Sequence, residues 1–380
     1  MTLALSTLCE NPRRRTGLTT LFHEFVGEAL RQSADVRWIV FAGPGQRWDI
    51  ADPRVELVRD FPANDRLYAR LWADHFRVGP AARRRGADAL LTVGFVPVRA
   101  PLPVAMHVFA LPRRRGAAGR AGGLRALYRG QALRSGLRRA ALVIANSDWT
   151  AGHLRAESPG VAPRLLRSHE GLAHAQFRPE APPGEGAQLQ RELGLPPRYL
   201  LWVSNFYPYK QAERLIAAYA RLKPGLRAEF PLVMAGGEWQ GGRERAKEQS
   251  RRLGVGGEAR FIGWVEDRRL AALYRQARAH VLPSAEETFG KTVTEAMACG
   301  CPCVLNDLPV LREVAGGAAQ MADFTDASAA AAALAAVCRD DGLAGRLRAA
   351  GLRRAADFSY EKLARERIER IRSMLGRSAS

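Results

Sequence analysis

The feature that most constrains the fold is an alternation of short apolar runs with helical stretches and glycine-rich turns, which occurs in both halves of the chain. Alternation of this kind predicts βαβ units and a parallel sheet. The strands expected in the first half are residues 2–8, 38–43, 89–94, 103–110 and 141–147. Those expected in the second half are residues 199–205, 231–237, 260–265, 280–284 and 302–307. The sequence therefore predicts an α/β protein with two Rossmann-like, doubly wound parallel-sheet domains.

A cluster of prolines and glycines separates the two halves. It consists of Pro179, Pro182, Pro183, Gly184, Gly186, Pro196 and Pro197. Because such clusters interrupt regular structure, we expect a linker at residues 181–198. It would join an N-terminal domain of residues 1–180 to a C-terminal domain of residues 199–358. The amphipathic residues 359–380 are expected to form a helix that packs back on the first domain.

Neither a transmembrane helix nor a secretory signal is expected. The chain has no run of about 18 apolar residues, the length that a membrane-spanning helix needs. The apolar residues at the N-terminus precede the arginines, which is the reverse of the order in a secretory signal. We therefore expect a cytoplasmic protein.

The chain is strongly basic, with a formal net charge of +20 that comes almost entirely from arginine. An excess of this kind attracts phosphates, anionic lipid or nucleic acid without selecting among them. Residues 113–139 carry nine arginines and no acidic residue, with a partial apolar face that includes Leu127 and Tyr128. This segment favours peripheral contact with an anionic membrane over specific nucleic-acid binding. A solvated loop and helix is the alternative.

Three cysteines, Cys299, Cys301 and Cys303, alternate along one segment. Zinc sites usually space their cysteines as C-x2-C with a second pair elsewhere. We interpret these three as small buried apolar residues and expect no metal site.

Two glutamates, Glu287 and Glu295, stand eight residues apart around a Phe289-Gly290 turn. Glycine before a helix lets a ligand approach the backbone, and the free N–H groups of the helix start favour an anion such as a pyrophosphate. A carboxylate before the turn can accept hydrogen bonds from sugar hydroxyls, and one in the first helical turn can hold the vicinal diol of a ribose. Residues Thr292 to Glu295 also fit a capping box, so Glu295 either caps its own helix or binds a diol.

Lys210 is the first lysine of the chain and stands between an expected strand and an amphipathic helix. A reaction in which a phosphate group leaves builds negative charge on that phosphate. A fixed cation at that point stabilises the transition state more than the ground state. Lys210 is therefore our candidate for this role, and a solvated lysine is the alternative.

Residues 283–305 resemble the signature of glycosyltransferase family 4, the E-x7-E motif of GT-B-fold enzymes. The resemblance is close over residues 199–320 and loose in the first domain. It implies the GT-B fold, in which two Rossmann-like domains face a cleft. It also implies a retaining transfer of a hexosyl unit from a nucleoside diphosphate sugar. The chain contains no Asp-x-Asp pair to hold a metal on the diphosphate, so we expect metal-independent chemistry without a cofactor.

The resemblance implies roles for single residues. Glu287 would contact the donor sugar, Lys210 the diphosphate and Glu295 the ribose. The residues expected to bind the donor are Asn205, Gly236, Gly237, Phe289, Gly290, Lys291, Thr292 and Glu295. The family usually has an arginine at the position of Asn205, so one diphosphate contact is missing from the expected set.

In the first domain the resemblance points to the first strand-to-helix loop and to one histidine. Gly17 would form the turn of that loop, where Arg13–Arg15 would meet phosphate or a charged acceptor. His107 would lie near the transferred sugar as a third catalytic residue. Val108 stands where the family usually has an aspartate.

The expected function is therefore transfer from a UDP-, GDP- or dTDP-linked sugar to a glycan or lipid-linked acceptor held by the first domain. Family association suggests cell-envelope polysaccharide or glycoconjugate synthesis, with the protein peripheral on the inner face of the plasma membrane. Two alternatives stay open. One is a sugar phosphorylase or nucleotide-sugar epimerase on the same fold, and the other is a basic protein that binds membrane or nucleic acid.

Overall fold

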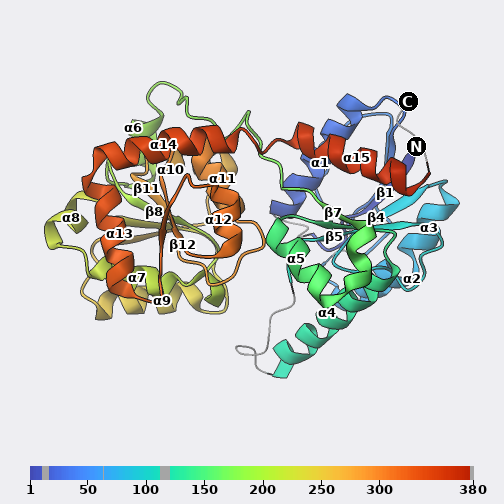
Figure 1. The fold of residues 1–380 in the computed structure, drawn as a ribbon, viewed down its shortest axis with the longest axis horizontal. Coiled ribbons are helices and arrows are strands. Elements are labelled where there is room, and N and C mark those ends of the chain that lie inside the picture. Colours follow the sequence, from blue (N-terminus) through green and yellow to red (C-terminus); the bar gives the residue numbers. More distant parts are fainter. Residues whose placement is uncertain (11–16, 63, 112–119, 377–380) are drawn as a thin grey trace. The chain divides into compact units, whose positions relative to one another are not determined.

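The structure is a computed structural model that describes residues 1–10, 17–62, 64–111 and 120–376. The chain divides into two compact units, each with its own sheet and helices (Figure 1). Unit 1 comprises Met1–Gly171 and Tyr360–Ser380, and unit 2 comprises Leu172–Ser359. Within the described residues, no helix is long and apolar enough to span a membrane.

Unit 1 is built on a seven-stranded parallel sheet with the order β3-β2-β1-β4-β5-β6-β7. The strands are β1 Thr2–Ser6, β2 Arg37–Phe41, β3 Val55–Val58, β4 Ala89–Val93, β5 Val104–Val108, β6 Leu142–Ala145 and β7 Leu165–Arg167. The helices are α1 Gly17–Gln32, α2 Leu67–Phe76, α3 Val78–Arg84, α4 Arg120–Arg139, α5 Asp148–Glu157, the 3-10 turn η1 Pro159–Arg164 and α15 Tyr360–Met374. The central strands are continuous apolar runs because helices cover both faces of the sheet.

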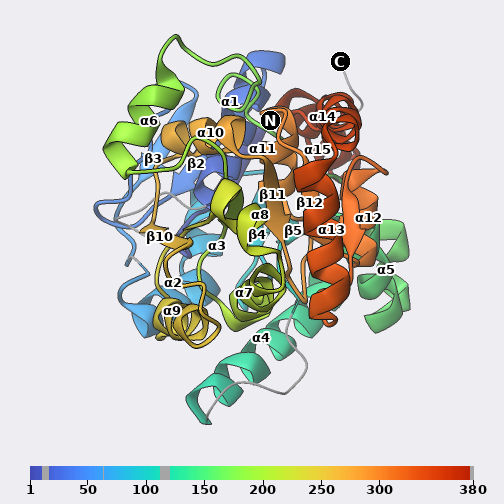
Figure 2. The ribbon, with the colours of Figure 1, turned by 90° about the vertical axis from the view of Figure 1, so that its left-hand side faces the viewer.

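Unit 2 holds a six-stranded parallel sheet with the order β10-β9-β8-β11-β12-β13. Its strands are β8 Leu200–Val203, β9 Leu232–Ala235, β10 Ala259–Gly263, β11 Ala279–Leu282, β12 Cys303–Asn306 and β13 Gln320–Ala322. Its helices are α6 Glu185–Leu193, the 3-10 turn η2 Pro208–Lys210, α7 Ala212–Ala220, α8 Pro224–Glu229, α9 Gly242–Arg252, α10 Asp267–Gln276, α11 Lys291–Ala298, α12 Pro309–Ala315, α13 Ala327–Arg339 and α14 Asp341–Ala355. Helices α10, α11 and α14 lie on one face of the sheet and α7, α9 and α13 on the other (Figures 1 and 2).

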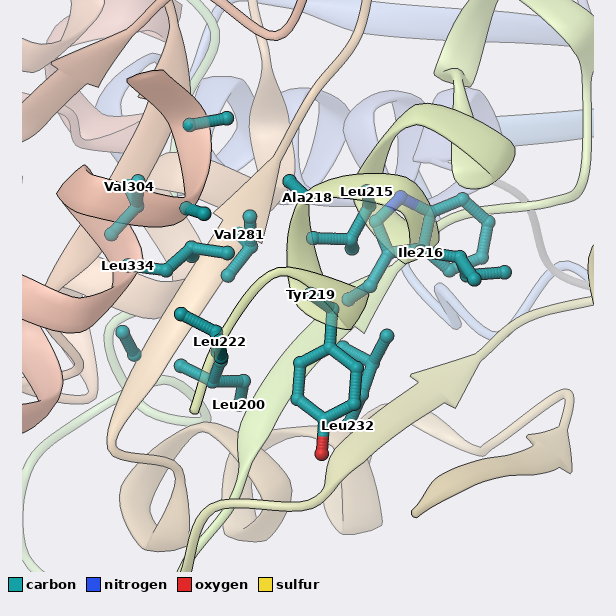
Figure 3. Close-up of a cluster of buried hydrophobic side chains, with 14 of the residues drawn as sticks. Leu200, Leu215, Ile216, Ala218, Tyr219, Leu222, Leu232, Val281, Val304 and Leu334 are labelled. Atoms are coloured by element: carbon teal, nitrogen blue, oxygen red, sulfur yellow. The ribbon is translucent and has the colours of Figure 1, made fainter. Parts of the chain in front are cut away.

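An apolar cluster of unit 2 lies between its sheet and the α7 layer (Figure 3). Helix α7 contributes Leu215, Ile216 and Tyr219, which pack against strand residues such as Leu200 and Val281. All five side chains are fully removed from solvent. Burying an aliphatic side chain of this size contributes ~1.5–3 kcal/mol to the free energy of unfolding. The packing of α7 against the sheet therefore fixes the positions of the strands and of the loops that follow them.

The two parallel sheets of the sequence prediction are confirmed, but three strands were not expected. Strand β3 is half exposed and its apolar residues are broken by Glu56, while β7 and β13 are only three residues long. All three lie at sheet edges. A short edge strand buries little, so its sequence carries little apolar periodicity.

The segment expected as a linker is partly helical. Residues 181–198 contain α6, which begins after Gly184 and ends before Gly194. Arg275 of α10 donates to Glu185 of α6, with Nη2 and Oε1 2.5 Å apart, and both side chains are largely buried. This segment is therefore packed against the rest of unit 2.

The last helix, α15, belongs to unit 1, where it packs against α1. Its buried face contains Leu363, Ala364, Ile368 and Ile371, and also Arg367, which is only 1% exposed. A charged side chain at this depth requires hydrogen-bonding partners. Those partners connect α15 to one of the expected site residues.

Candidate active site

The loop after β11 and the loop after β8 meet through one ion pair. Lys210 Nζ donates to Glu287 Oε1 over 2.6 Å, and the two side chains are only 15% and 9% exposed. The backbone N–H of Ala285 also donates to the carbonyl of Tyr209 over 2.8 Å, and Lys210 Nζ lies 5.1 Å from the centroid of the Tyr209 ring. The structure therefore brings together the two residues that the sequence assigned to the sugar and the diphosphate.

Helix α11 begins beside this ion pair. Gly290 is its N-cap residue, with a φ of 93° that side chains rarely tolerate. Thr292 consequently lies inside the first turn and not at the N-cap position, so the capping-box interpretation of Glu295 is wrong. The N–H groups at a helix start favour an anion, and Glu287 comes four residues before the first residue of α11.

Glu295 is a buried carboxylate with identified partners. Tyr274 Oη donates to its Oε2 over 3.3 Å, and Lys291 Nζ lies 3.9 Å from its Oε1. Burial, and secondarily the Glu295 charge, raises the pKa of Tyr274 well above its ordinary value, so this hydroxyl keeps its proton and donates. Glu295 is thereby held in one position on the face of α11.

The turn after β9 explains why asparagine stands at position 205. Gly236 adopts a φ of 151°, and a Cβ there would lie 1.6 Å from the carbonyl oxygen of Ser204, so only glycine fits. Asn205 Oδ1 accepts a hydrogen bond from the N–H of Gly237 over 2.9 Å. Asn205 therefore connects the loop after β8 to the glycine turn after β9. The family that the sequence resembles usually has an arginine at the position of Asn205.

Phe289 lies in the core and not on the surface of the turn. Its ring is 2% exposed and meets the ring of Phe358 edge to face, with centroids 5.6 Å apart. Phe289 thus anchors the turn whose next residue, Gly290, starts α11. A direct contact between this ring and a ligand has no support in the geometry.

His280 in β11 was not identified from the sequence. Its Nδ1 lies 3.2 Å from the carbonyl of Leu201, which can only accept, so Nδ1 carries the proton and Nε2 accepts from the Thr292 hydroxyl over 3.3 Å. Burial, together with the nearby Lys210 charge, lowers the pKa of His280 to about 3. The ring is neutral and fixes Thr292 in the first turn of α11. Its position within an otherwise apolar strand was the available sequence signal.

An aromatic group borders the same edge of the sheet. The Tyr207 ring lies 5.5 Å from the Tyr209 ring and 4.7 Å from the Trp239 ring, and Trp239 is 40% exposed. These residues follow β8 and β9, next to Lys210. They offer a flat apolar surface that the sequence interpretation did not include.

In unit 1, His107 is buried on β5 beside a buried arginine. Arg367 Nη1 lies 3.3 Å from His107 Nδ1, and Arg367 also donates from Nε to Ser168 Oγ over 3.3 Å. Because a guanidinium only donates, Nδ1 is the accepting nitrogen and the proton resides on Nε2. Burial, and then the Arg367 charge, lowers the pKa of His107 well below its ordinary value. His107 is therefore neutral, with an Nε2–H that has no partner among the described residues.

The remaining expected residues lie in different places. Gly17 is exposed at the start of α1, and Arg13–Arg15 lie outside the described residues. Cys299, Cys301 and Cys303 are buried free thiols, and burial raises the pKa of each, as expected for small apolar side chains.

Two kinds of sequence match identify relatives. Residues 188–354 match the family model described as glycosyl transferases group 1. The Escherichia coli O-antigen chain mannosyltransferase B is 29% identical over 64% of this chain and 64% of that protein. The Salinispora arenicola D-inositol 3-phosphate glycosyltransferase is 31% identical over 58% of this chain and 52% of that protein. The chain thus spans roughly half to two thirds of the length of these curated relatives.

Solved structures resemble the chain over almost its whole length. Sucrose-phosphate synthase from Thermosynechococcus elongatus has a TM-score of 0.80 at 21% identity, covering 99% of both chains. WaaG, a glycosyltransferase involved in lipopolysaccharide biosynthesis, has a TM-score of 0.73 at 15% identity, covering 97% of this chain and 98% of that chain. The chain has the GT-B fold.

The expected GT-B fold class and the expected resemblance to GT-B glycosyltransferases are confirmed. A third GT-B neighbour, Anabaena HepE in complex with UDP and glucose, has a TM-score of 0.74 at 18% identity, covering 98% of this chain and 100% of that chain. The family match over residues 188–354 contains Lys210, Glu287 and Glu295. Gly17 and His107 lie outside it.

Proposed function

We propose that the protein is a retaining glycosyltransferase of family 4 that transfers a hexosyl unit from a nucleoside diphosphate sugar. The observation that carries this proposal is the Lys210–Glu287 pair beside the start of α11. It combines a cation, a carboxylate and a helix start at the carboxyl edge of a parallel sheet. That edge is where doubly wound sheets bind nucleotides. The glycosyltransferase relatives and the UDP-bound neighbour support a nucleotide-sugar donor.

Each residue has a role in donor binding under this proposal. The diphosphate lies at the start of α11, where Lys210 and the N–H groups of Lys291 and Thr292 neutralise its charge. Glu287 accepts hydrogen bonds from sugar hydroxyls, and Glu295 holds the ribose diol. The Lys210–Glu287 pair occupies both side chains before the donor arrives. Donor binding then exchanges this contact for contacts to phosphate and sugar.

The transfer step breaks the bond between the anomeric carbon and the diphosphate oxygen. The leaving diphosphate carries the electron pair, and Lys210 stabilises its charge more strongly than that of the intact donor. The acceptor hydroxyl attacks from the face that the diphosphate leaves, and its proton passes to a leaving phosphate oxygen. The configuration of the anomeric carbon is retained. The sequence contains no Asp-x-Asp pair, so we assign charge neutralisation to Lys210 and α11 instead of to a metal.

His107 supplies a neutral hydrogen-bond donor in this scheme. Its Nδ1 accepts from Arg367, so the Nε2–H is available to a sugar hydroxyl. A neutral donor orients a hydroxyl without adding positive charge where the sugar itself becomes cationic in the transition state. His107 is therefore a catalytic residue of the proposal and Arg367 a residue that positions it.

The acceptor is proposed to be a glycan or glycolipid of the cell envelope, bound by unit 1 at the inner face of the plasma membrane. The O-antigen chain mannosyltransferase relative and the lipopolysaccharide enzyme WaaG favour this class of acceptor. The basic charge of the chain supports contact with anionic lipid. No specific nucleic-acid partner and no bound cofactor are proposed.

The first experiment identifies the donor. UDP-, GDP- and dTDP-linked hexoses are tested for a rise in melting temperature, and a donor at about 100 times its Kd stabilises the folded state by ~2.7 kcal/mol. Glu287→Ala and Lys210→Ala are each expected to lower turnover by orders of magnitude. If both variants keep near-normal transfer, the site assignment is wrong.

A second measurement separates transfer from its alternatives on the same fold. Release of nucleoside diphosphate that depends on an acceptor glycan supports a transferase. Release that requires inorganic phosphate would identify a phosphorylase, and a change of sugar configuration without release would identify an epimerase.

A further inference from the structure

Unit 1 contains a pocket that the proposed donor site does not use. Its volume is about 230 Å³, and it lies at the carboxyl ends of β1, β4 and β5. Its walls include Val93, Phe95 and Phe109 from the strand ends, Arg70 from α2, and Tyr128 and Arg129 from α4. The carboxyl edge of a doubly wound sheet is its usual ligand-binding edge.

The pocket adjoins the proposed catalytic histidine. Phe109, which lines the pocket, contacts the ring of His107 in a tilted arrangement with centroids 3.9 Å apart. A molecule in the pocket would therefore lie one aromatic ring away from His107. This is the place where a group that accepts a sugar is needed.

Two arginines give the pocket its charge. Arg70 Nη1 donates to Asp74 Oδ2 over 3.0 Å, and Asp74 Oδ1 accepts from Ser6 Oγ over 2.8 Å, so the guanidinium is held rigidly against β1. The Nε of Arg70 is buried and has no partner among the described residues. Arg129 is exposed, and none of the ion pairs in the described part of the chain includes it. One ordered and one free guanidinium suit a phosphate group.

The thiol at the pocket wall does not suggest a covalent role. Burial, with the neighbouring carboxylates of Glu10 and Asp74, raises the pKa of Cys9 far above its ordinary value. A thiol that stays protonated is a poor nucleophile. The remaining wall is apolar, so the pocket suits an anionic group attached to an apolar body.

An exposed aromatic face continues outward from the pocket along α2. Tyr68 is 86% exposed, Trp72 57% and Phe76 37%, and their spacing of four residues places them on one face of the helix. His75 of α2 connects this helix to α4, because its Nε2 lies 2.7 Å from Tyr128 Oη. Helices α2 and α4 lie at the same side of the sheet of unit 1 (Figure 1).

Such a face has a specific physical meaning. Three large aromatic side chains on one helix face are rarely left to water without a partner. Aromatic residues interleaved with arginines are typical of the boundary between lipid tails and anionic head groups. Leu127 on α4 is also exposed, at 59%.

We propose that the acceptor is a lipid with an anionic phosphate head group, presented by a membrane. The head group enters the pocket beside Arg70 and Arg129, and the aromatic face of α2 lies in the membrane interface. This inference rests on the proposed function, because it names the class of acceptor for the same reaction. Positive charge and exposed apolar surface together match an anionic lipid better than an uncharged soluble glycan, which offers the two arginines no counter-charge.

The test measures binding of the full-length protein to vesicles. Partition is compared between pure phosphatidylcholine vesicles and mixed phosphatidylcholine–phosphatidylglycerol vesicles. Wild-type protein is expected to prefer the mixed vesicles. Arg129→Gln should weaken partition about five-fold, since each arginine near an anionic surface contributes ~1 kcal/mol. Trp72→Ser should weaken it about ten-fold because an aromatic side chain no longer enters the interface.

Matched controls use exposed residues outside the surface. Arg155→Gln removes an exposed arginine of α5, and Leu253→Ser removes a 42% exposed leucine after α9. Both should stay within roughly two-fold of wild type. Equal losses in the controls and in the two test variants would overturn the proposed surface.

A further variant tests the pocket separately from the surface. Ala132→Trp places a large ring at the pocket wall without changing charge. The preference for phosphatidylglycerol over phosphatidylcholine should then fall several-fold while the aromatic face still binds lipid. An unchanged preference would show that the pocket does not hold the head group. Soluble glycerol phosphate is used as a competitor. If the pocket binds glycerol phosphate but the protein does not bind vesicles, the ligand is a free phosphate compound and the membrane part of the proposal is wrong.

Failure of this inference is separable from failure of the proposed function. Donor binding is followed by thermal shift with the nucleotide sugars, and its main contacts in the proposal, Lys210, Glu287 and Glu295, lie in unit 2. One outcome is that the protein binds anionic vesicles no more tightly than neutral ones and that Trp72→Ser causes no loss of binding. If a donor still stabilises the protein in that case, only the acceptor inference is wrong. Binding of single-stranded RNA with the same dependence on Trp72 and Arg129, and no binding to vesicles, would also overturn it.

Discussion

Replacing one member of the Lys210–Glu287 pair should destabilise unit 2 far more than replacing both members. The atoms are 2.6 Å apart and the side chains are 15% and 9% exposed, so a lone partner would be an almost buried charge. Removing one member of such a pair costs ~3–5 kcal/mol, whereas replacing both with apolar residues is close to neutral. We expect Lys210→Met and Glu287→Leu each to lower the free energy of unfolding by about 3 kcal/mol. This is the lower end of the range, because the lysine keeps partial hydration. The double variant should lie within about 1 kcal/mol of wild type.

The assay is urea unfolding followed by tryptophan fluorescence, supported by thermal melts. For a unit of this size, 1 kcal/mol shifts the melting temperature by ~2–4 °C, so each single variant should melt about 6–12 °C lower. The double variant should melt near wild type and yet show no transfer and no stabilisation by donor. Simple addition of the two single losses would refute the idea that these charges interact. A double variant that still transfers sugar would refute their role in donor binding.

Two further predictions follow from the geometry of unit 2. Gly236→Ala should abolish donor-induced stabilisation and lower the urea midpoint strongly, because its Cβ would lie 1.6 Å from the Ser204 carbonyl oxygen, whereas Gly225→Ala, which has open space, should behave as wild type. The second concerns pH: burial lowers the pKa of His280 to about 3, whereas the unfolded value is about 6.5. The unfolded chain therefore gains a proton that the folded chain does not, and stability is lost as pH falls below about 6.5 by ~1.4 kcal/mol per pH unit. His280→Asn should make urea midpoints less sensitive to acid over that range, and identical slopes for the two proteins would contradict the neutral, buried state of the ring.

The sequence predicted the central strands and the glycine before α11 because their signals are local. Strands buried on both faces are continuous apolar runs, and a helix start with a glycine before it is visible in a few residues. The sequence did not predict the Lys210–Glu287 contact, although both residues lie in loops that follow neighbouring central strands of one parallel sheet. Neighbouring strand ends meet at one edge of a parallel sheet, so the strand order brings these two loops together.

Features that depend on distant packing were missed. Arg367 and His107 are 260 residues apart, and neither residue reveals its partner in its own surroundings. The arginine could have been noticed only as a charged residue on the apolar face of its helix. The segment around α6 was interpreted as a linker because glycine and proline flank it, although its contact with Arg275 packs it into unit 2. Edge strands such as β3 bury too little to show a clear pattern.

The buried Arg367 has a consequence for how the protein becomes competent during synthesis. Unit 1 takes its sheet from residues that precede unit 2 and α15 from residues that follow it, so all of unit 2 is translated in between. Until α15 has left the ribosome, His107 lacks the guanidinium that fixes its proton on Nε2, and α1 lacks the helix that covers it. A nascent chain that has already folded unit 2 therefore still has an incomplete unit 1. Unit 1 reaches its final state only after α15 has been synthesised, later than the strands of its sheet.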